Sequence, residues 1–452
     1  MAQMAAAGRI QGAGVACCVA LVAMSPAAWA VDFQQAYEAA VANDAQVRAS
    51  RAGTEAVRER IPQARAQLLP NVSFSAGRNH NDLTSETANL LGQPVTRDIK
   101  YYSGNQALTV RQPLYRPYQL ASLRQARAQV EDAEASLEKD EQSLVVRVGE
   151  SYFEALLAED QLQLIGAQKM TYVTQLDAAR KRFAAGAGTR TDIDEAQARL
   201  DLVVAQELEA RQNQDFTLRR LEVLMGQPVT VLAPLNVARF EAQAPVPARV
   251  EDWIARAESG SPELQSLKAQ LDAAREEIEK AKAGHRPTLD AVAQWSRSNS
   301  DTVTSVNNRY DNKSVGLQLS VPLYAGGYVS STVRQAVAAE MRAREMLEAA
   351  RRDLGVRVHR EYRGVTEGVL KIAALEQAVR SADLAVTSNR RSFDAGIRTT
   401  LDVLNAEQQK TMALRDLAQA RYLYLVSRLR LQSLSGGARD ISVAQTNSWL
   451  TP

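Results

Sequence analysis

Two short segments of the chain place a threonine hydroxyl and an aspartate carboxylate three residues apart. Thr189 precedes Asp192, and Thr399 precedes Asp402. At the start of a helix, such a pair can bind the free backbone N–H groups of the first turn. The carboxylates can also pair with a cation, and Arg398 lies directly before Thr399. The spacing leaves two uses open for each aspartate, a helix cap or an ion pair.

Motifs for catalysis and for metal binding are missing from the sequence after residue 30. It has no G-x-x-x-x-G-K-[ST] phosphate loop, no G-x-S-x-G turn and no H-E-x-x-H zinc motif. The three histidines, His80, His285 and His359, lie far apart, and we interpret them as ordinary surface or core residues. The sequence therefore predicts no enzyme, no cofactor and no metal site.

The composition is typical of long helices. Of the 452 residues, 45% are apolar, with a large share of alanine, and only 5% are aromatic. Lysine and arginine number 54 against 52 aspartates and glutamates, which gives a net charge of +2. Because this balance produces no basic field, we expect no nucleic acid partner.

The N-terminus has the features of a secretory signal peptide. Arg9 precedes an apolar run over residues 15–24, and the small-x-small sequence AWA, which ends at Ala30, provides a cleavage site. We therefore expect residues 1–30 to be removed, and both cysteines of the chain lie within them. A mature protein without disulfides follows from this prediction.

The chain contains the same unit twice. The stretch KRFAAGAGTRTDIDEA, which ends at Ala196, recurs as RSFDAGIRTTLDVLNA, which ends at Ala406, 210 positions later. Such a duplication predicts two copies of one supersecondary unit. We place the first repeat at 31–226, a linker at 227–260, the second repeat at 261–436 and a C-terminal tail at 437–452.

Both repeats are predicted to contain long helices, because two tracts rich in Ala, Leu, Glu, Gln and Arg contain no proline. The first of these helices would be roughly 100 Å long. Each long helix ends near a glycine, and the Thr-x-x-Asp pair then begins a return helix. The predicted helices cover about 31–67, 118–182, 189–225, 262–283, 328–392 and 399–435.

Polar and apolar residues alternate in four segments, which is the pattern of β-strands. Each segment is about as long as a tilted strand that crosses a bilayer, although a soluble sheet can show the same alternation. In a membrane, four strands cannot close on themselves and lipid tolerates no unpaired edge, so several chains would have to complete one barrel. We expect strands at about 69–78, 102–115, 287–297 and 314–324, joined by polar loops at about 79–100 and 298–313.

Three motifs resemble the TolC family of outer-membrane channel proteins, which serve multidrug efflux and type I secretion in Gram-negative bacteria. They are QPLY ending at Tyr115, VPLY ending at Tyr324, and DAGIRTTLDVLNAEQ beginning at Asp394. The resemblance implies a fold that is mainly α with a membrane β-barrel portion, in which three chains form a 12-stranded barrel continuous with a long α-helical tunnel. It also implies that the linker 227–260 and the tail 437–452 form an equatorial belt.

The resemblance further implies that a gate lies at the periplasmic tip of the tunnel. In the family, an arginine of the second-repeat turn pairs with an aspartate of the first-repeat turn, and these positions match Arg398 and Asp192. A constriction of two aspartates matches Asp402 and Asn405, so that the second acid is replaced here by an amide. A tyrosine of the same network aligns with Phe393, which lacks the hydroxyl.

The resemblance also implies partners and a function. The tip turns, Gly186 and Ala187 in the first repeat and Gly396 and Ile397 in the second, are expected to contact a periplasmic adaptor. The other expected partners are two further copies of the chain in a homotrimer, an inner-membrane ABC or proton-driven transporter, and outer-membrane lipid. We expect a passive exit duct for type I protein secretion or general efflux. The alternatives are a dedicated multidrug efflux duct and, less favoured, a soluble periplasmic coiled-coil adaptor.

Overall fold

The computed structural model describes residues 30–302, 305–437 and 439–450. The predicted signal peptide, apart from Ala30, and both cysteines lie outside the described residues. In chain order the elements are α1 (Phe33–Asn43), α2 (Ala45–Arg58), α3 (Arg60–Ala66), β1 (Asn71–Ala88), β2 (Pro94–Tyr115), α4 (Pro117–Ala184), α5 (Arg190–Met225), α6 (Val250–Gly260), α7 (Pro262–Ala283), β3 (Thr288–Thr302), β4 (Ser305–Ser320), α8 (Tyr328–Asp394), α9 (Thr400–Leu434) and α10 (Arg439–Asn447).

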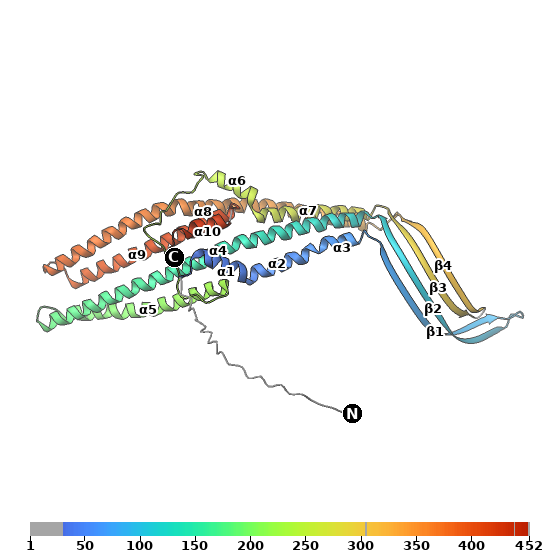
Figure 1. Ribbon diagram of the computed structural model, residues 1–452, viewed down its shortest axis with the longest axis horizontal. Coiled ribbons are helices and arrows are strands. Elements are labelled where there is room, and N and C mark those ends of the chain that lie inside the picture. The colour runs from blue at the N-terminus through green and yellow to red at the C-terminus, as the bar shows by residue number, and fades with distance from the viewer. Residues whose placement is uncertain (1–29, 303–304, 438, 451–452) are drawn as a thin grey trace, which may run out of the picture.

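The molecule is a rod with a β-sheet at one end and two helical turns at the other (Figure 1). Helices α4 and α8, of 68 and 67 residues, each run from the sheet to the far tip. At 1.5 Å per residue each is about 100 Å long. The return helices α5 and α9 cover the tip half of the rod, whereas α7 and α1 to α3 cover the half nearer the sheet.

The four strands form one antiparallel sheet in the order β1-β2-β3-β4. One row of the register joins Val72, Val110, Ala293 and Val315, and these residues share a face. Exposed apolar side chains gather on that face, since Val72, Phe74, Leu317 and Leu319 are all more than half exposed in the single chain.

The strands are longer than the sequence predicted, and the expected loops at 79–100 and 298–313 are wrong for most of their length. Strand β1 continues to Ala88 and β2 begins at Pro94, so that only a short turn joins them. The turn contains Gly92 at φ 74°, and the Asn89 side chain accepts from the backbone N–H of Leu91. Ladder hydrogen bonds form between backbones, so polar side chains do not end a strand once its partner is in register.

Strand β4 ends at Ser320 rather than near residue 324. Pro322 follows within two residues and has no N–H to donate to the neighbouring strand. The single helix expected over 31–67 is divided into three, with breaks at Asp44 and Glu59. Asp44 ends α1, and its side chain caps α2 by accepting from the N–H of Val47 at 2.8 Å. The linker and the tail contain two unpredicted helices, α6 and α10.

The main core lies midway along the rod, where these added helices are found. Phe33 of α1 lies between Tyr152 and Phe153 of α4, with ring centroids 5.8 and 5.7 Å away. The Tyr152 hydroxyl lies 3.0 Å from the carbonyl oxygens of Val31 and Ala233, which ties the N-terminal segment and the linker to α4. We call this region, where the N-terminal segment, the linker and the tail pack on the long helices, the belt. It holds the middle of the rod together, whereas the tip half is held together by contacts within and between the helix pairs.

Candidate functional site at the helical tip

Both tip turns are formed by a glycine in the left-handed region. Gly186 has φ 74° and Gly396 has φ 76°. The N–H of Ala187 donates to Arg182 O at 3.0 Å, and that of Ile397 donates to Ser392 O at 2.8 Å. Residues with a side chain are strained at this φ, so glycine is what allows each long helix to stop and reverse within a few residues.

A capping box begins each return helix. The N–H of Thr189 donates to Asp192 Oδ2 at 3.1 Å, and the N–H of Asp192 donates to Thr189 Oγ1 at 3.2 Å. Thr399 and Asp402 repeat the arrangement at 2.9 and 3.3 Å. Of the two uses that the sequence left open, the helix cap is therefore made at both aspartates.

The pKa values of both aspartates are lowered. For Asp192 the main cause is the hydrogen bond from the Thr189 side chain, and the Thr400 hydroxyl of the other repeat contributes. For Asp402 the main cause is the backbone N–H of Thr399, and Arg398 adds a favourable charge. Both carboxylates are therefore stabilised in the ionised form.

Arg398 forms its ion pair within its own repeat. Its Nη1 lies 3.4 Å from Asp402 Oδ1, one helical turn away. The expected partner Asp192 is held by Thr189 and contacts the second repeat through Thr400, which is buried. Asp192 and Arg398 nevertheless line one groove of about 610 Å³ between the two turns.

Phe393 is in contact with a cation of the other repeat. The Arg182 guanidinium lies 4.2 Å from the centroid of the Phe393 ring. A cation over an aromatic face is attracted by the ring quadrupole, an interaction of about 0.5–1 kcal/mol at exposed sites. The ring therefore joins the ends of α4 and α8 without needing a hydroxyl.

Asn405 also has a partner in the first repeat. Arg199 Nη2 donates to Asn405 Oδ1 at 2.8 Å, and the same guanidinium contacts Gln408 one turn further along α9. An amide oxygen accepts such a hydrogen bond as a carboxylate does, but without a net charge. Asn405 thus offers an acceptor without charge at the position where the resemblance implied an acid.

A small apolar cluster lies next to these polar contacts. Leu404 of α9 is fully buried and packs against Tyr172 of α4 and Val203 of α5, with Ile165 and Leu200 partly buried beside them. The cluster excludes water from the contact between the two helical hairpins.

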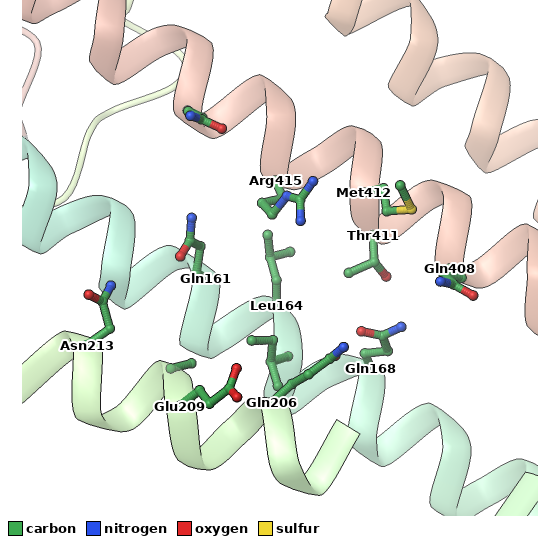
Figure 2. Close-up of a pocket in the computed structure, with 13 residues that line it drawn as sticks. Gln161, Leu164, Gln168, Gln206, Glu209, Asn213, Gln408, Thr411, Met412 and Arg415 are labelled. Atoms are coloured by element: carbon green, nitrogen blue, oxygen red, sulfur yellow. The ribbon is translucent and has the colours of Figure 1, made fainter. Parts of the chain in front are cut away.

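Beyond this cluster, a groove of about 660 Å³, lined by both amide and apolar side chains, separates the hairpins. Figure 2 shows amide side chains from three helices facing it, among them Gln161 of α4, Gln206 of α5 and Gln408 of α9. Amide-lined walls of this kind are readily hydrated. In the tip half of the rod the two hairpins therefore touch near the tip and at the belt, with this groove between the two contacts. Nearer the sheet the repeats also meet along α4 and α7 and between β2 and β3.

Sequence reasoning did not find Arg182, Arg199, Thr400 or Leu404. Each acts across the interface between repeats, and no local spacing marks such a partner. The described residues contain no group of three or more His, Cys, Asp or Glu side chains that could hold a metal ion. Within the same residues no helix combines the length and the apolar composition that a membrane span requires.

A sequence model of the family described as Outer membrane efflux protein matches residues 36–227 and 253–437. The chain belongs to this family. The two matched segments contain the α4/α5 and α8/α9 hairpins, and the resemblance drawn from the sequence is confirmed. Membership of the outer membrane efflux protein family places the protein in the outer membrane.

Two relatives within the family cover most of the chain. The alkaline protease secretion protein AprF of Pseudomonas aeruginosa is 37% identical over 90% of this chain and 85% of its own length. The proteases secretion protein PrtF of Dickeya chrysanthemi is 33% identical over 93% of this chain and 92% of its own length.

The solved structure of the outer-membrane channel OprN has the same fold. It matches with a TM-score of 0.78 at 17% sequence identity, and the match covers 90% of each chain. The predicted fold class, mainly α with a membrane β-barrel portion, is confirmed.

Proposed function

We propose that this outer-membrane protein is the exit duct of a type I protein secretion system. The observation that carries the proposal is its similarity to two protease secretion proteins, at 37% and 33% identity over 90% and 93% of this chain. In this role the protein is a passive conduit without enzymatic activity, and the energy for transport comes from its partners.

The proposed assembly is a homotrimer. In a single chain the sheet has β1 and β4 at its edges. Because lipid cannot hydrogen-bond to an open edge, β1 of one chain has to pair with β4 of the next. Three chains would form a closed barrel of 12 strands and would gather the long hairpins into a tunnel below it.

The proposed partners are a periplasmic adaptor and an inner-membrane ABC transporter. The two tip turns present Gly186, Ala187, Gly396 and Ile397 at the end of the rod, and the Ile397 side chain is 78% exposed. An exposed isoleucine on a turn offers an apolar contact to the hairpin of an adaptor.

The tip is the gate in this proposal, and Asp192, Phe393, Arg398, Asp402 and Asn405 belong to it. Within each chain, the contact of Arg182 with Phe393 and that of Arg199 with Asn405 hold the two hairpins together. The apolar cluster around Leu404 also joins the hairpins, whereas the groove above it separates them. Release of the tip contacts would therefore let the hairpins move apart as far as the belt.

A multidrug efflux duct is the second candidate, because the family description itself names efflux. The soluble adaptor is set aside, since the family consists of outer-membrane proteins. The two remaining candidates differ in what the duct transports, which is a protein in one case and a small molecule in the other.

A secretion assay in a strain without its own exit duct tests the proposal. The chain would be expressed with the ABC transporter and the adaptor of an alkaline protease system. We expect protease activity in the medium that depends on all three proteins. Restored resistance to drugs without secreted protease would instead support the efflux duct and overturn the secretion role.

A further inference from the structure

The outward face of the sheet ends in basic residues on the side away from the helices. Period-two alternation places the apolar residues of each strand on one face, which we assign to lipid. Along β1 this apolar run ends at Arg78, along β3 at Arg297 and along β4 at Lys313. Three of the four strands therefore change from apolar to basic at the same face.

These three residues lie at one level of the membrane when the tilt of the strands is included. On β1 the apolar run ends at Arg78, whose register row reaches β4 at Arg309. On β4 the apolar run ends at Lys313, which is four residues closer to the helices than Arg309. Four residues are about 14 Å along a strand, and three strand spacings are about 14 Å across the sheet. The boundary is thus inclined by about 45° to the rows, close to the tilt of strands in membrane barrels.

The helix-side edge of the apolar band is displaced in the same sense. On β1 the apolar run begins at Val72, which shares a register row with Val315 of β4. On the β4 side, exposed apolar side chains continue beyond this row toward the helices, as far as Leu323. Tyrosines mark this edge, since Tyr115, Tyr324 and Tyr328 are all exposed. The two edges of the band therefore differ, with tyrosines on the periplasmic side and cations on the outer side.

Two of the outer cations form no ion pair with the residues that the structure describes. Arg297 is paired with Asp311 at 3.0 Å. Arg78 and Arg309 have no carboxylate within ion-pair distance in the part of the chain that the structure describes. The charge of Lys313 interacts with that of Asp311 on the same strand. A long basic side chain at the edge of the hydrocarbon layer extends into the headgroup region, where it can pair with an anionic group.

A hollow in the sheet lies between two of these cations. One register row begins at Arg78, passes through Gly104 and Asn299, and ends at Arg309. All four residues line the hollow, together with Tyr102. Gly104 contributes no side chain, and the Arg78 guanidinium lies 5.0 Å from the centroid of the Tyr102 ring. Two guanidinium groups with an amide between them form a set of donors suited to phosphate oxygens.

We propose that this surface, made of Arg78, Arg309, Lys313 and the hollow at Gly104, binds the phosphate groups of the phosphorylated glycolipid of the outer leaflet. The proposal rests on insertion of the sheet into the outer membrane with the helices in the periplasm, and not on the cargo of the duct. In the assembled barrel β1 and β4 meet at each junction between chains, so both arginines lie on strands that form this junction. The hollow between them lies at β2 and β3, in the middle of one chain's four strands, so the lipid would bind within one subunit and not at the seam.

A binding experiment with the purified full-length protein in detergent tests this proposal. Diphosphoryl lipid A, the same glycolipid without phosphates, and inorganic phosphate are titrated, and binding is measured by native mass spectrometry. We expect Arg78→Gln/Arg309→Gln to weaken binding of diphosphoryl lipid A about tenfold or more, because two charge-assisted contacts are lost. The matched control is Arg352→Gln/Arg363→Gln, which removes two exposed arginines from α8 and should bind like the wild type.

Further outcomes decide the proposal clearly. Equal binding by the wild type and the Arg78/Arg309 double variant would overturn it, as would equal binding of the dephosphorylated glycolipid. If inorganic phosphate bound as tightly as lipid A, the surface would be a site for a free anion and the lipid proposal would fail. Arg78→Lys/Arg309→Lys keeps the charge and should retain most of the binding, which separates lost recognition from failure to fold. Protease secretion by the glutamine variant tests the duct separately and should persist.

Discussion

The guanidinium of Arg182 lies over the ring of Phe393, 4.2 Å from its centroid, so the end of α4 is joined to the end of α8. These two residues come from different repeats of the duplicated sequence. Phe393, for which the resemblance implied a tyrosine in the family, thus has a cation as the partner of its ring. The contact connects the two hairpins at the point furthest from the membrane.

Replacement of Arg182 should loosen the tip. Arg182→Ala removes a contact of about 0.5–1 kcal/mol in each chain, and in a trimer the loss occurs three times. We expect a higher single-channel conductance in planar bilayers. Lys181→Ala is the control, because Lys181 pairs with Asp177 of its own helix and should leave the conductance unchanged. A wild-type conductance for Arg182→Ala would remove this contact from the gate.

Arg398 is expected to contribute to closure as well. Its pair with Asp402 is exposed and is worth about 0–1 kcal/mol within one chain, but the residue also lines the groove that contains Asp192. Arg398→Ala, alone or with Asp192→Ala, should raise the conductance. If both variants conduct like the wild type, Arg398 acts only on its own helix.

Asn405 can be replaced by an acid to test the role of the amide. In Asn405→Asp the Arg199 guanidinium would meet a carboxylate, and charge-assisted hydrogen bonds are about twice as strong as neutral ones. We expect a lower conductance and greater selectivity for cations. Asn405→Leu removes the acceptor and should change the conductance in the opposite direction, so that a similar effect of both variants would contradict the assignment.

Acid should loosen the starts of α5 and α9. The pKa values of Asp192 and Asp402 are lowered in the folded chain, chiefly by hydrogen bonds from the Thr189 side chain and the Thr399 N–H. Their stabilising effect is complete above the unfolded pKa of about 3.9 and is lost as pH falls towards the lowered folded values. Amide exchange, corrected for intrinsic rates, should therefore rise at these two helix starts below about pH 4. The double variant Asp192→Asn/Asp402→Asn should lack this dependence.

The belt should show the opposite dependence on pH. Burial raises the pKa of Asp160, although the Tyr422 hydroxyl donates to its Oδ2 at 2.7 Å and opposes the shift. A carboxyl group with a raised folded pKa favours folding while it is protonated, and this contribution is lost as pH rises from the unfolded value through the folded one. Asp160→Asn should remove this part of the pH dependence of thermal unfolding. Identical pH profiles for the variant and the wild type would contradict the assignment.

Much of the fold could be predicted from the sequence, because its signals are local. Gly186 and Gly396, with the threonine and aspartate that follow, mark the tip turns, and proline-free tracts mark the helices. The extent of the strands could not be predicted, since residues such as Asn81 and Asn308 are polar and are held in the sheet by backbone pairing with a neighbour. Pro322, in contrast, ends β4 for a reason that the sequence does contain.

The candidate site could be predicted only in part. The turn residues were found because each turn is a local motif, and Asp192 and Asp402 were correctly considered as caps. Arg182 and Arg199 were missed because each contacts a residue more than 200 positions away in the chain. A sequence without aligned relatives gives no sign of such a pair, and only the side-by-side arrangement of the two hairpins, with both turns at the same end of the rod, brings it together.

The unequal lengths of the helices determine which parts of the rod are free to move. Helices α4 and α8 pass through the belt without a break and are held at the sheet, whereas α5 and α9 end at the belt. The two long helices are therefore held at both the sheet and the belt, whereas the two short helices are held only at the belt and, through the tip turns, by the long ones. Motion at the periplasmic end can be taken up by bending below the belt, so the pore in the membrane can keep one diameter while the entrance changes.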